Sequence, residues 1–403
     1  MAFFAANTLP QSSNVNVPPL LTVLVVMGAG IAVIGTLISL TQAMLFVTGG
    51  MLGLALYHAS FGFTGGWKRF ATEGRSRSMR VQFLMIGLTA LIFIPLLNGL
   101  NPFDHSFVGA WAPVGVSVIL GAFIFGLGMQ LGGGCGSGTL FTVGGGSSRM
   151  LLTLSGFIIG AAVGTAHLPY WLSLPSLPLI TLGGSFGPLL GTAVTLIGIA
   201  AIIGILATLE KRKHGNIESV FHGLADLTPA RFLHGPWPLI VAALVLAVGN
   251  VLTLFLAGHP WSVTYGFGLW GAKIFNAAGI PVESWAFWQN PAQARALNQS
   301  VLFDVTSVMN FGVILGAALA ASLAGKFAEK AKVHFASYLA AVLGGLLMGY
   351  GARLSFGCNI GALFSGIASG SLHGWVWFVM AFLGSLLGIA LRPLFGLDGF
   401  KRK

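Results

Sequence analysis

Ten long apolar segments constrain the fold of this 403-residue chain more than any other feature. A membrane-spanning helix needs about 20 mostly apolar residues, and each segment approaches or exceeds that length. Only 7% of the residues are charged, against about 25% in a soluble domain. The segments lie near residues 19–40, 42–63, 81–99, 112–131, 150–168, 186–209, 238–258, 301–325, 335–353 and 373–396. The sequence therefore predicts one all-α, polytopic membrane domain, residues 1–403, with about ten transmembrane helices.

A glycine-rich motif occurs twice and contains the only two cysteines of the chain. The first copy covers residues 126–141 around Cys135, and the second covers 349–364 around Cys358. Both copies carry too much glycine for a good continuous helix. Broken backbone at membrane depth survives where it is buried in protein or lines a watery cavity. We therefore expect re-entrant half-helices at both cysteines, with a tight glycine-mediated helix contact as the alternative.

The basic residues indicate the orientation of the chain. Membrane proteins collect Lys and Arg in cytoplasmic loops, so the net charge of +11 needs no nucleic-acid partner. The basic segment 68–80 and the connecting loop 210–237 are accordingly predicted to be cytoplasmic. Counting ten spans places further basic residues on the same side: Lys326, Lys330, Lys332, Arg392, Lys401, Arg402 and Lys403. We expect a multi-pass protein of the inner (plasma) membrane with both termini in the cytoplasm.

The two halves of the chain are predicted to be inverted relative to each other. Five predicted spans, an odd number, lie between the cysteines, so the motifs enter the membrane from opposite sides. We place the first half at 42–209 and the second at 238–396. A weaker repeat supports this division, because Ser60-Phe61-Gly62-Phe63 resembles Thr264-Tyr265-Gly266-Phe267. Inverted halves with discontinuous helices are typical of transporters.

Residues 258–300 are too interrupted for a clean span. We interpret them as an external re-entrant piece followed by a surface stretch. Trp270, Trp285 and Trp288 in this region are expected at the membrane interface, where tryptophan is enriched.

The two cysteine motifs are the candidate substrate pathway. The N-terminus of a half-helix offers free backbone N–H groups and a partial positive charge, which favour an anion. A protonated thiol is a weak donor, and weak binding suits a conducting site. A lone buried cysteine is more often a small core residue, but the symmetry of the motifs favours the pathway. The candidates are Cys135, Cys358, Gly134, Gly136, Ser137, Gly357, Asn359, Arg353, Gln130 and His58, with Thr139 and Ser365 as further neutral donors.

Arg353 and His58 are the charged or titratable candidates. Arg353 precedes Cys358 on the outer side, and Gln130 is its counterpart in the first motif. A cation at the outer mouth would raise the local anion concentration, whereas pairing with Asp304 or snorkelling is the alternative. His58 is a candidate proton relay, although a histidine on an apolar face is usually structural. Asp304 is a candidate for proton coupling, but helix N-capping is the better interpretation.

The sequence favours transport over enzyme activity. It contains no nucleotide-binding loop, metal-ligand spacing or hydrolytic constellation, so we expect no cofactor and no metal. Two other functions stay open. One is a membrane thiol–disulfide oxidoreductase that cycles a disulfide between Cys135 and Cys358, and the other is a channel for a small neutral solute.

Both motifs resemble signatures of the YeeE/YedE family of sulfur-transport membrane proteins. The residues that carry the resemblance are Gly-Gly-Gly-Cys-Gly-Ser-Gly-Thr in the first copy, and 349–367 followed by Ser-Leu-His-Gly-Trp at 371–375 in the second. The similarity covers roughly residues 45–396.

The resemblance implies uptake of thiosulfate, or of a related sulfur or selenium species. It also implies that Cys135 and Cys358 pass the ion along through S–H contacts to its sulfur. Thiosulfate-uptake members carry a further pathway cysteine near one mouth, which this chain lacks. A soluble sulfur carrier of the TusA type is the implied partner on the cytoplasmic side, in addition to the lipid bilayer.

Overall fold

The computed structural model describes residues 15–103, 105–329 and 334–400. In this part of the chain every named element is a helix, and ten helices are long and apolar enough to cross a membrane. The prediction of an all-α polytopic membrane protein is therefore confirmed. The predictions for Lys330, Lys332 and residues 401–403 lie outside the described residues.

The first part of the chain contains six of the candidate spans, and two of them are interrupted. The breaks separate α2 from α3 and α5 from α6, where the sequence is rich in glycine. The helices are α1 Val17–Leu37, α2 Leu40–His58, α3 Phe63–Glu73, α4 Arg77–Leu97, α5 Val116–Gly132, α6 Gly136–Gly144, α7 Ser148–Ser173, α8 Leu182–Phe186 and α9 Pro188–His214. The spans end within a few residues of the predicted limits, because hydropathy marks them clearly.

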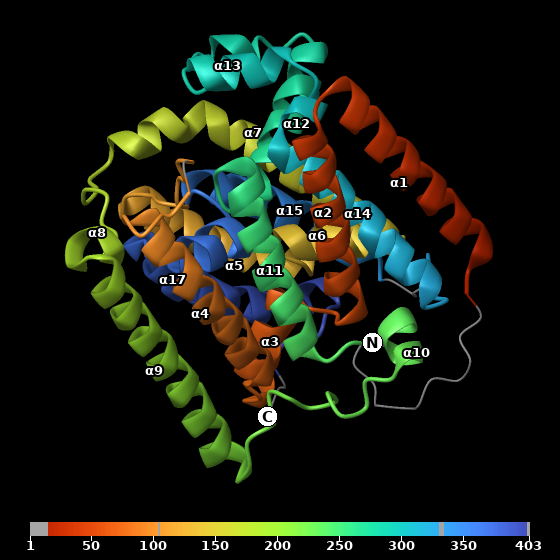
Figure 1. The fold of residues 1–403 in the computed structure, drawn as a ribbon, viewed down its shortest axis with the longest axis vertical. Helices are drawn as coiled ribbons and strands as arrows, with labels where there is room; N and C mark the ends of the chain where they lie inside the picture. The colour runs from red at the N-terminus through yellow and green to blue at the C-terminus, as the bar shows by residue number, and fades with distance from the viewer. Residues whose placement is uncertain (1–14, 104, 330–333, 401–403) are drawn as a thin grey trace.

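The second part repeats this pattern of long helices and short pieces (Figure 1). Its elements are α10 Pro229–His234, α11 Leu239–Ala257, α12 Thr264–Ala277, η1 Val282–Ser284, α13 Pro291–Asn298, η2 Val301–Phe303, α14 Val305–Leu323, α15 Phe335–Leu354, η3 Asn359–Ser365, α16 Gly366–Ala368, α17 Leu372–Leu391 and η4 Arg392–Phe395. The element η3 is one turn of π-helix that continues directly into α16.

Helices from the two parts pack in matching pairs. α5 packs against α15, α7 packs on α15 as α17 packs on α5, and α2 packs on α14 as α11 packs on α4. Glycine permits the closest of these contacts, since small residues let membrane helices approach. A Cβ atom added at Gly344 of α15 would lie 2.2 Å from the backbone nitrogen of Gly132 in α5. The centre of the molecule is therefore built from interleaved helices of both parts.

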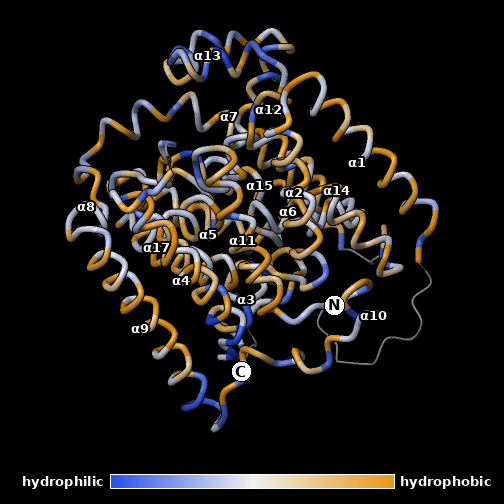
Figure 2. Tube along the Cα trace, in the orientation of Figure 1, coloured by the Kyte–Doolittle hydropathy of each residue, from blue (hydrophilic) through white to orange (hydrophobic). Residues whose placement is uncertain are grey.

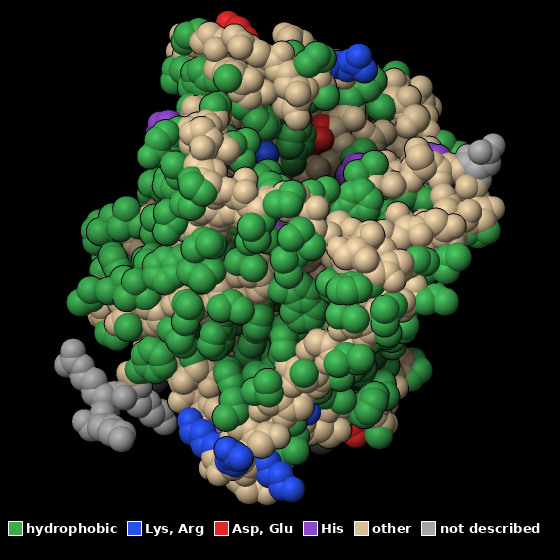
Figure 3. All heavy atoms as spheres, turned by 90° about the vertical axis from the view of Figure 1, so that its left-hand side faces the viewer, with side chains coloured by type: hydrophobic (Ala, Val, Ile, Leu, Met, Phe, Trp, Pro, Cys, Tyr) green, Lys and Arg blue, Asp and Glu red, His purple; other side chains and the backbone are tan. Residues whose placement is uncertain are grey.

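Apolar side chains cover the outer faces of the peripheral helices. Figure 2 shows α1 and α9 as largely hydrophobic tubes at the edge of the molecule, and Leu37 and Leu189 are each 72% exposed. On the face drawn in Figure 3, hydrophobic side chains form a broad belt above a lower end that carries Lys and Arg. Near the opposite end this face is hollowed. An apolar belt with basic residues at one end is the arrangement expected in a bilayer.

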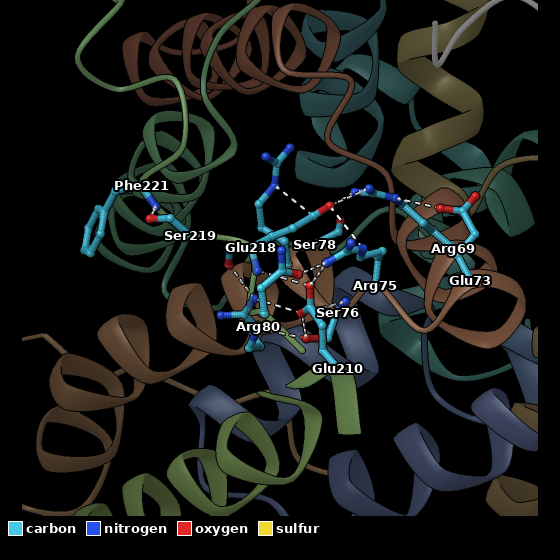
Figure 4. A network of polar contacts seen from close by, with 12 residues as sticks. Arg69, Glu73, Arg75, Ser76, Ser78, Arg80, Glu210, Glu218, Ser219 and Phe221 are labelled. Atoms are coloured by element: carbon cyan, nitrogen blue, oxygen red, sulfur yellow. Dashed lines mark hydrogen bonds and ion pairs between the residues drawn. The ribbon is translucent and has the colours of Figure 1, made fainter. Parts of the chain in front are cut away.

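A cluster of ion pairs and hydrogen bonds links several helices at the end of the molecule that carries Lys and Arg (Figure 4). The fully buried Glu210 of α9 accepts hydrogen bonds from Ser76 Oγ at 2.6 Å and Arg80 Nη2 at 3.1 Å. Glu218 forms a bidentate pair with Arg69, at 2.7 and 3.0 Å. The cluster thereby ties the end of α9 and the following segment to α3 and to the start of α4.

The region 258–300 contains the 14-residue helix α12 where a re-entrant piece was expected, and the interface prediction is wrong for Trp288. This side chain is only 1% exposed, and its indole N–H donates to Thr165 Oγ1 of α7 at 2.9 Å. A buried acceptor on a distant helix therefore holds an indole that the sequence placed at the lipid surface. The N-capping interpretation of Asp304 is confirmed, because Asp304 Oδ2 accepts from the Ser307 backbone N–H at 2.7 Å.

Candidate functional site

Each cysteine is the residue that begins a short helix. Cys135 precedes α6, and its Sγ accepts a hydrogen bond from the Gly138 N–H at 3.4 Å. Cys358 precedes η3 in the same extended backbone conformation. Both thiols therefore lie at helix N-termini, where backbone N–H groups lack helical partners and the helix dipole is positive.

Glycine makes both turns possible. Gly133 ends α5 at φ +87°, and Gly357 precedes Cys358 at φ +153°, conformations that other residues rarely adopt. The two loops also fold onto their own half-helices in the same way. A Cβ at Gly134 would lie 3.1 Å from Gly138 C, and a Cβ at Gly357 would lie 3.1 Å from Gly361 C. The shared glycines of the two motifs therefore serve the same local geometry.

The two half-helices extend toward opposite ends of the molecule. Gly145, just after α6, accepts a hydrogen bond from Ala328 N at 2.9 Å in the segment between α14 and α15. Gly370, just after α16, accepts one from Leu182 N at 2.7 Å between α7 and α9. An odd number of spans separates these two connecting segments. The cysteine-bearing ends therefore approach each other while the far ends diverge.

The thiol of Cys358 lies beside the backbone that carries Cys135. A Cβ atom added at Gly136 would be 3.0 Å from Cys358 Sγ and 3.4 Å from Cγ1 of Val263, the residue just before α12. Cys135 is 1% exposed and Cys358 is fully buried, and both thiols are free. In this conformation the meeting point of the half-helices is closed to solvent from both ends.

Two buried amides beside the cysteines have unused hydrogen-bonding atoms. Neither Oδ1 nor Nδ2 of the fully buried Asn359 has a partner within the described residues. Asn310 donates to the Val263 carbonyl at 2.9 Å, and its Oδ1 is also without a partner in that part of the chain. An unsatisfied buried polar atom costs about 1–3 kcal/mol, so these amides are suited to contact a ligand or water.

The hydroxyl candidates divide into two groups. Ser137 Oγ lies 3.5 Å from Cys135 Sγ and is close enough to act with it. Thr139 donates to the Cys135 carbonyl at 2.8 Å, and Ser365 donates to the Trp261 carbonyl at 2.9 Å. The last two hydroxyls therefore stabilise the broken backbone.

Gln130 and His58 pack against neighbouring elements, and Gln130 Oε1 and both ring nitrogens of His58 have no hydrogen-bond partner within the described residues. The Gln130 amide donates to the Thr64 carbonyl at 3.2 Å and ties α5 to α3. His58 packs against the segment before α11, and its ring lies 5.4 Å from the ring of Trp237. The backbone N–H of Trp237 donates to the backbone carbonyl of His58 at 2.9 Å. Both side chains contact the backbone or rings of neighbouring elements.

Arg353 lines a small cavity described below. Among the described residues it forms no ion pair with Asp304, which was one of the alternatives. Its guanidinium carbon lies 4.5 Å from the centre of the Phe287 ring, a cation–π contact. Val263, Asn310, Ser262 and Tyr265 were not predicted as site residues. The repeat that contains Tyr265 was the only sequence signal near them.

Broken helices that meet at the centre of a ten-span bundle define a polytopic membrane protein of the kind that moves solutes. A family model described as "Sulphur transport" matches residues 58–387, and the chain therefore belongs to this family. The resemblance to YeeE/YedE proteins is thereby confirmed.

Curated relatives agree with the family assignment. The chain is 25% identical to the thiosulfate transporter TsuA of Spirochaeta thermophila, over 84% of this chain and 95% of TsuA. It is 24% identical to TsuA of Escherichia coli K12, over 84% of this chain and 91% of TsuA. It is 30% identical to the probable transporter YedE of Escherichia coli K12, in an alignment that covers only 38% of each chain.

Proposed function

We propose that this protein is a permease that takes up thiosulfate, or a chemically similar sulfur-containing anion, across the inner membrane. The observation that carries the proposal is the position of the Cys358 thiol, which lies beside Gly136 where two half-helices meet. The two TsuA relatives are thiosulfate transporters, which supports this choice of substrate.

In the proposed mechanism the ion passes Cys358 and Cys135 in series. At each cysteine the thiol donates a weak S–H hydrogen bond, and the N–H groups of the half-helix stabilise the negative charge. Asn359 and Ser137 supply neutral donors, while Gly134, Gly136 and Gly357 keep the turns narrow. Neutral, weak donors hold the ion without trapping it, as conduction requires.

We further propose that residues 42–209 and 238–396 are inverted repeats that open the pathway alternately to each side. The matching helix pairs support this, since the contacts α7–α15 and α2–α14 have the equivalents α17–α5 and α11–α4. In this arrangement the connecting segment 210–237 and both termini are cytoplasmic. A TusA-type carrier would receive the sulfur on that side.

Because the two cysteines are neighbours in the structure, one alternative function can also be tested, that of a membrane thiol–disulfide oxidoreductase. That function requires a disulfide between Cys135 and Cys358 that forms and is reduced again during turnover. Alkylation of intact cells before and after reduction distinguishes the two functions. Thiols that stay free during sulfur uptake support the permease, and a disulfide that turns over supports the oxidoreductase.

The permease proposal is tested by growth of a cell that depends on thiosulfate and lacks its own transporter. Expression of this protein should restore growth on thiosulfate. A strain with normal membrane expression and no growth would contradict thiosulfate as the substrate.

A further inference from the structure

A small cavity of about 60 Å³ lies between the Cys358 loop and the predicted external side of the molecule. We call it the outer cavity. One cation and three hydroxyl-bearing residues line it together with apolar groups, and its lining residues are Ala161, Ser262, Thr264, Tyr265, Ala352, Arg353 and Phe356. Each polar side chain in this lining can donate a hydrogen bond.

The cation of the outer cavity lacks an acidic partner. Arg353 leaves the last turn of α15 over Gly164 of α7, where an added Cβ would lie 2.7 Å from Arg353 Cβ. Its Nε atom is buried without a hydrogen-bond partner, and no salt bridge to Arg353 exists within the described residues. Arg353 is half-buried at the wall of the cavity, and a guanidinium without a carboxylate partner there is suited to an anionic ligand.

The hydroxyl groups of the outer cavity are also available. Within the described part of the chain, the Ser262, Thr264 and Tyr265 hydroxyls make no hydrogen bond to protein. The Tyr265 phenol is protonated at neutral pH, since a tyrosine has a pKa of about 10. Together with the fork of N–H donors on Arg353, these groups match the oxygens of a tetrahedral oxyanion.

The outer cavity directly adjoins the loop that carries Cys358. Phe356 forms part of its wall and precedes Cys358 by two residues, and the Ser262 Oγ lies 3.6 Å from where a Cβ at Gly361 would be. The outer cavity therefore lies against the loop that carries Cys358.

The Cys135 loop also has cations beside it, but these are already bonded to it, since Arg149 donates to the Gly132 carbonyl and Arg392 to the Gln130 carbonyl. Gln130 occupies the place of Arg353 in the first motif, and its amide is already bonded to the Thr64 carbonyl. Within the described residues the two sides therefore differ in how their arginines are bonded, because Arg353 Nε has no protein acceptor whereas Arg149 and Arg392 donate to the Cys135 loop. This difference favours capture of an anion on the Cys358 side, which agrees with uptake.

We propose that the outer cavity is a capture site for tetrahedral oxyanions, in which Arg353 binds the oxygen atoms before the ion reaches Cys358. The proposal rests on the proposed permease function and adds a sequence of binding steps. The oxygen atoms of the ion are recognised first, in the outer cavity, and its sulfur is recognised second, at Cys358. Sulfate shares the oxygen face of thiosulfate but lacks its terminal sulfur. Sulfate is therefore expected to bind the outer cavity and to compete with thiosulfate without being carried efficiently.

The test uses purified full-length protein in proteoliposomes with radiolabelled thiosulfate. Arg353→Gln should raise the KM for thiosulfate about tenfold to hundredfold, as expected for loss of a charge-assisted contact, and should abolish inhibition by sulfate. Arg353→Lys should restore part of both. Lys273→Gln is the matched control on the same side, because the Lys273 ammonium already donates to the carbonyls of Leu297 and Gln299 at 2.6 Å.

An unchanged KM together with retained sulfate inhibition in a folded Arg353→Gln protein would overturn the proposal. If that variant does not fold, Tyr265→Phe carries the test with an expected rise in KM of about two- to tenfold, and no rise overturns it.

Equilibrium binding of sulfate separates this proposal from the permease function. Calorimetry with Cys358→Ser should show sulfate binding that is lost in the double variant with Arg353→Gln. A wild-type protein that binds sulfate through Arg353 but carries no thiosulfate would contradict the permease and leave the capture site intact. Sulfate binding that is unaffected by Arg353→Gln would contradict the capture site.

Discussion

At the scale of single residues, two asparagines near the broken helices have opposite hydrogen-bonding states. Asn250 donates to Ser365 Oγ at 3.1 Å, and its Oδ1 accepts from the backbone N–H of Trp261 at 2.7 Å. Asn359 is equally buried but makes no such bond within the described residues. A buried amide retained without partners points to a role in contacting the substrate.

The two asparagines therefore give a matched prediction. Asn359→Leu should leave the melting temperature unchanged or higher, because no hydrogen bond is lost, but should reduce thiosulfate uptake. Asn250→Leu should destabilise the fold by about 1–3 kcal/mol, since it leaves buried partners unsatisfied. Thermal unfolding in detergent and uptake in proteoliposomes measure the two effects. Normal uptake by Asn359→Leu would show that this amide is not part of the pathway.

Gly136 gives a steric prediction at the same scale. A side chain there would meet Cys358 Sγ at 3.0 Å and Val263 at 3.4 Å, so Gly136→Val should reduce uptake to near background. Gly28→Val is the control, because an added Cβ at Gly28 has no atom within 4 Å. Uptake by Gly136→Val equal to that of the control would mean that the ion takes another route.

At the scale of elements, the end of α9 depends on one buried carboxylate. Glu210→Ala should destabilise the protein by about 3–5 kcal/mol, because it leaves the arginines around it without their partner. Glu73→Ala should have an effect of about 0–1 kcal/mol, since its pair with Arg69 is exposed. Thermal unfolding of both variants compares them directly. Equal unfolding temperatures for the two variants would show that the ion pairs of Glu210 do not stabilise the end of α9.

The sequence predicted elements better than it predicted contacts between them. Hydropathy located the ten spans, glycine located the breaks at the two cysteines, and Asp304 marked the start of α14, because each of these signals is local. The break between α2 and α3 was not predicted, since residues 42–63 were expected to form one span. The Glu210 cluster was not predicted, since the arginines of segment 68–80 were used only to assign the cytoplasmic side. The partner of Trp288 and the lining of the outer cavity were also missed. These contacts join segments that are far apart in the chain, and periodicity carries no information about them.

At the scale of the whole molecule, the orientation proposed for the bilayer places the basic end in the cytoplasm. In a Cys135→Ala, Cys358→Ala background, Glu283→Cys should react with an impermeant maleimide added to intact cells. Arg212→Cys should react only after the membrane is opened. Both positions are exposed, so accessibility is limited by the membrane alone. The reverse labelling pattern would invert the proposed topology.

The central claim is that a sulfur-containing anion crosses the molecule past two thiols in series. Thiosulfate uptake by proteoliposomes that contain wild type, Cys135→Ser, Cys358→Ser or the double variant tests this claim most directly. Each serine keeps the size and a donor but replaces a polarisable sulfur with a better-hydrated oxygen. We predict that either single variant folds normally and loses most uptake, and that the double variant is little worse than the weaker single one. Uptake near the wild-type rate in both single variants, at equal protein content, would contradict the account.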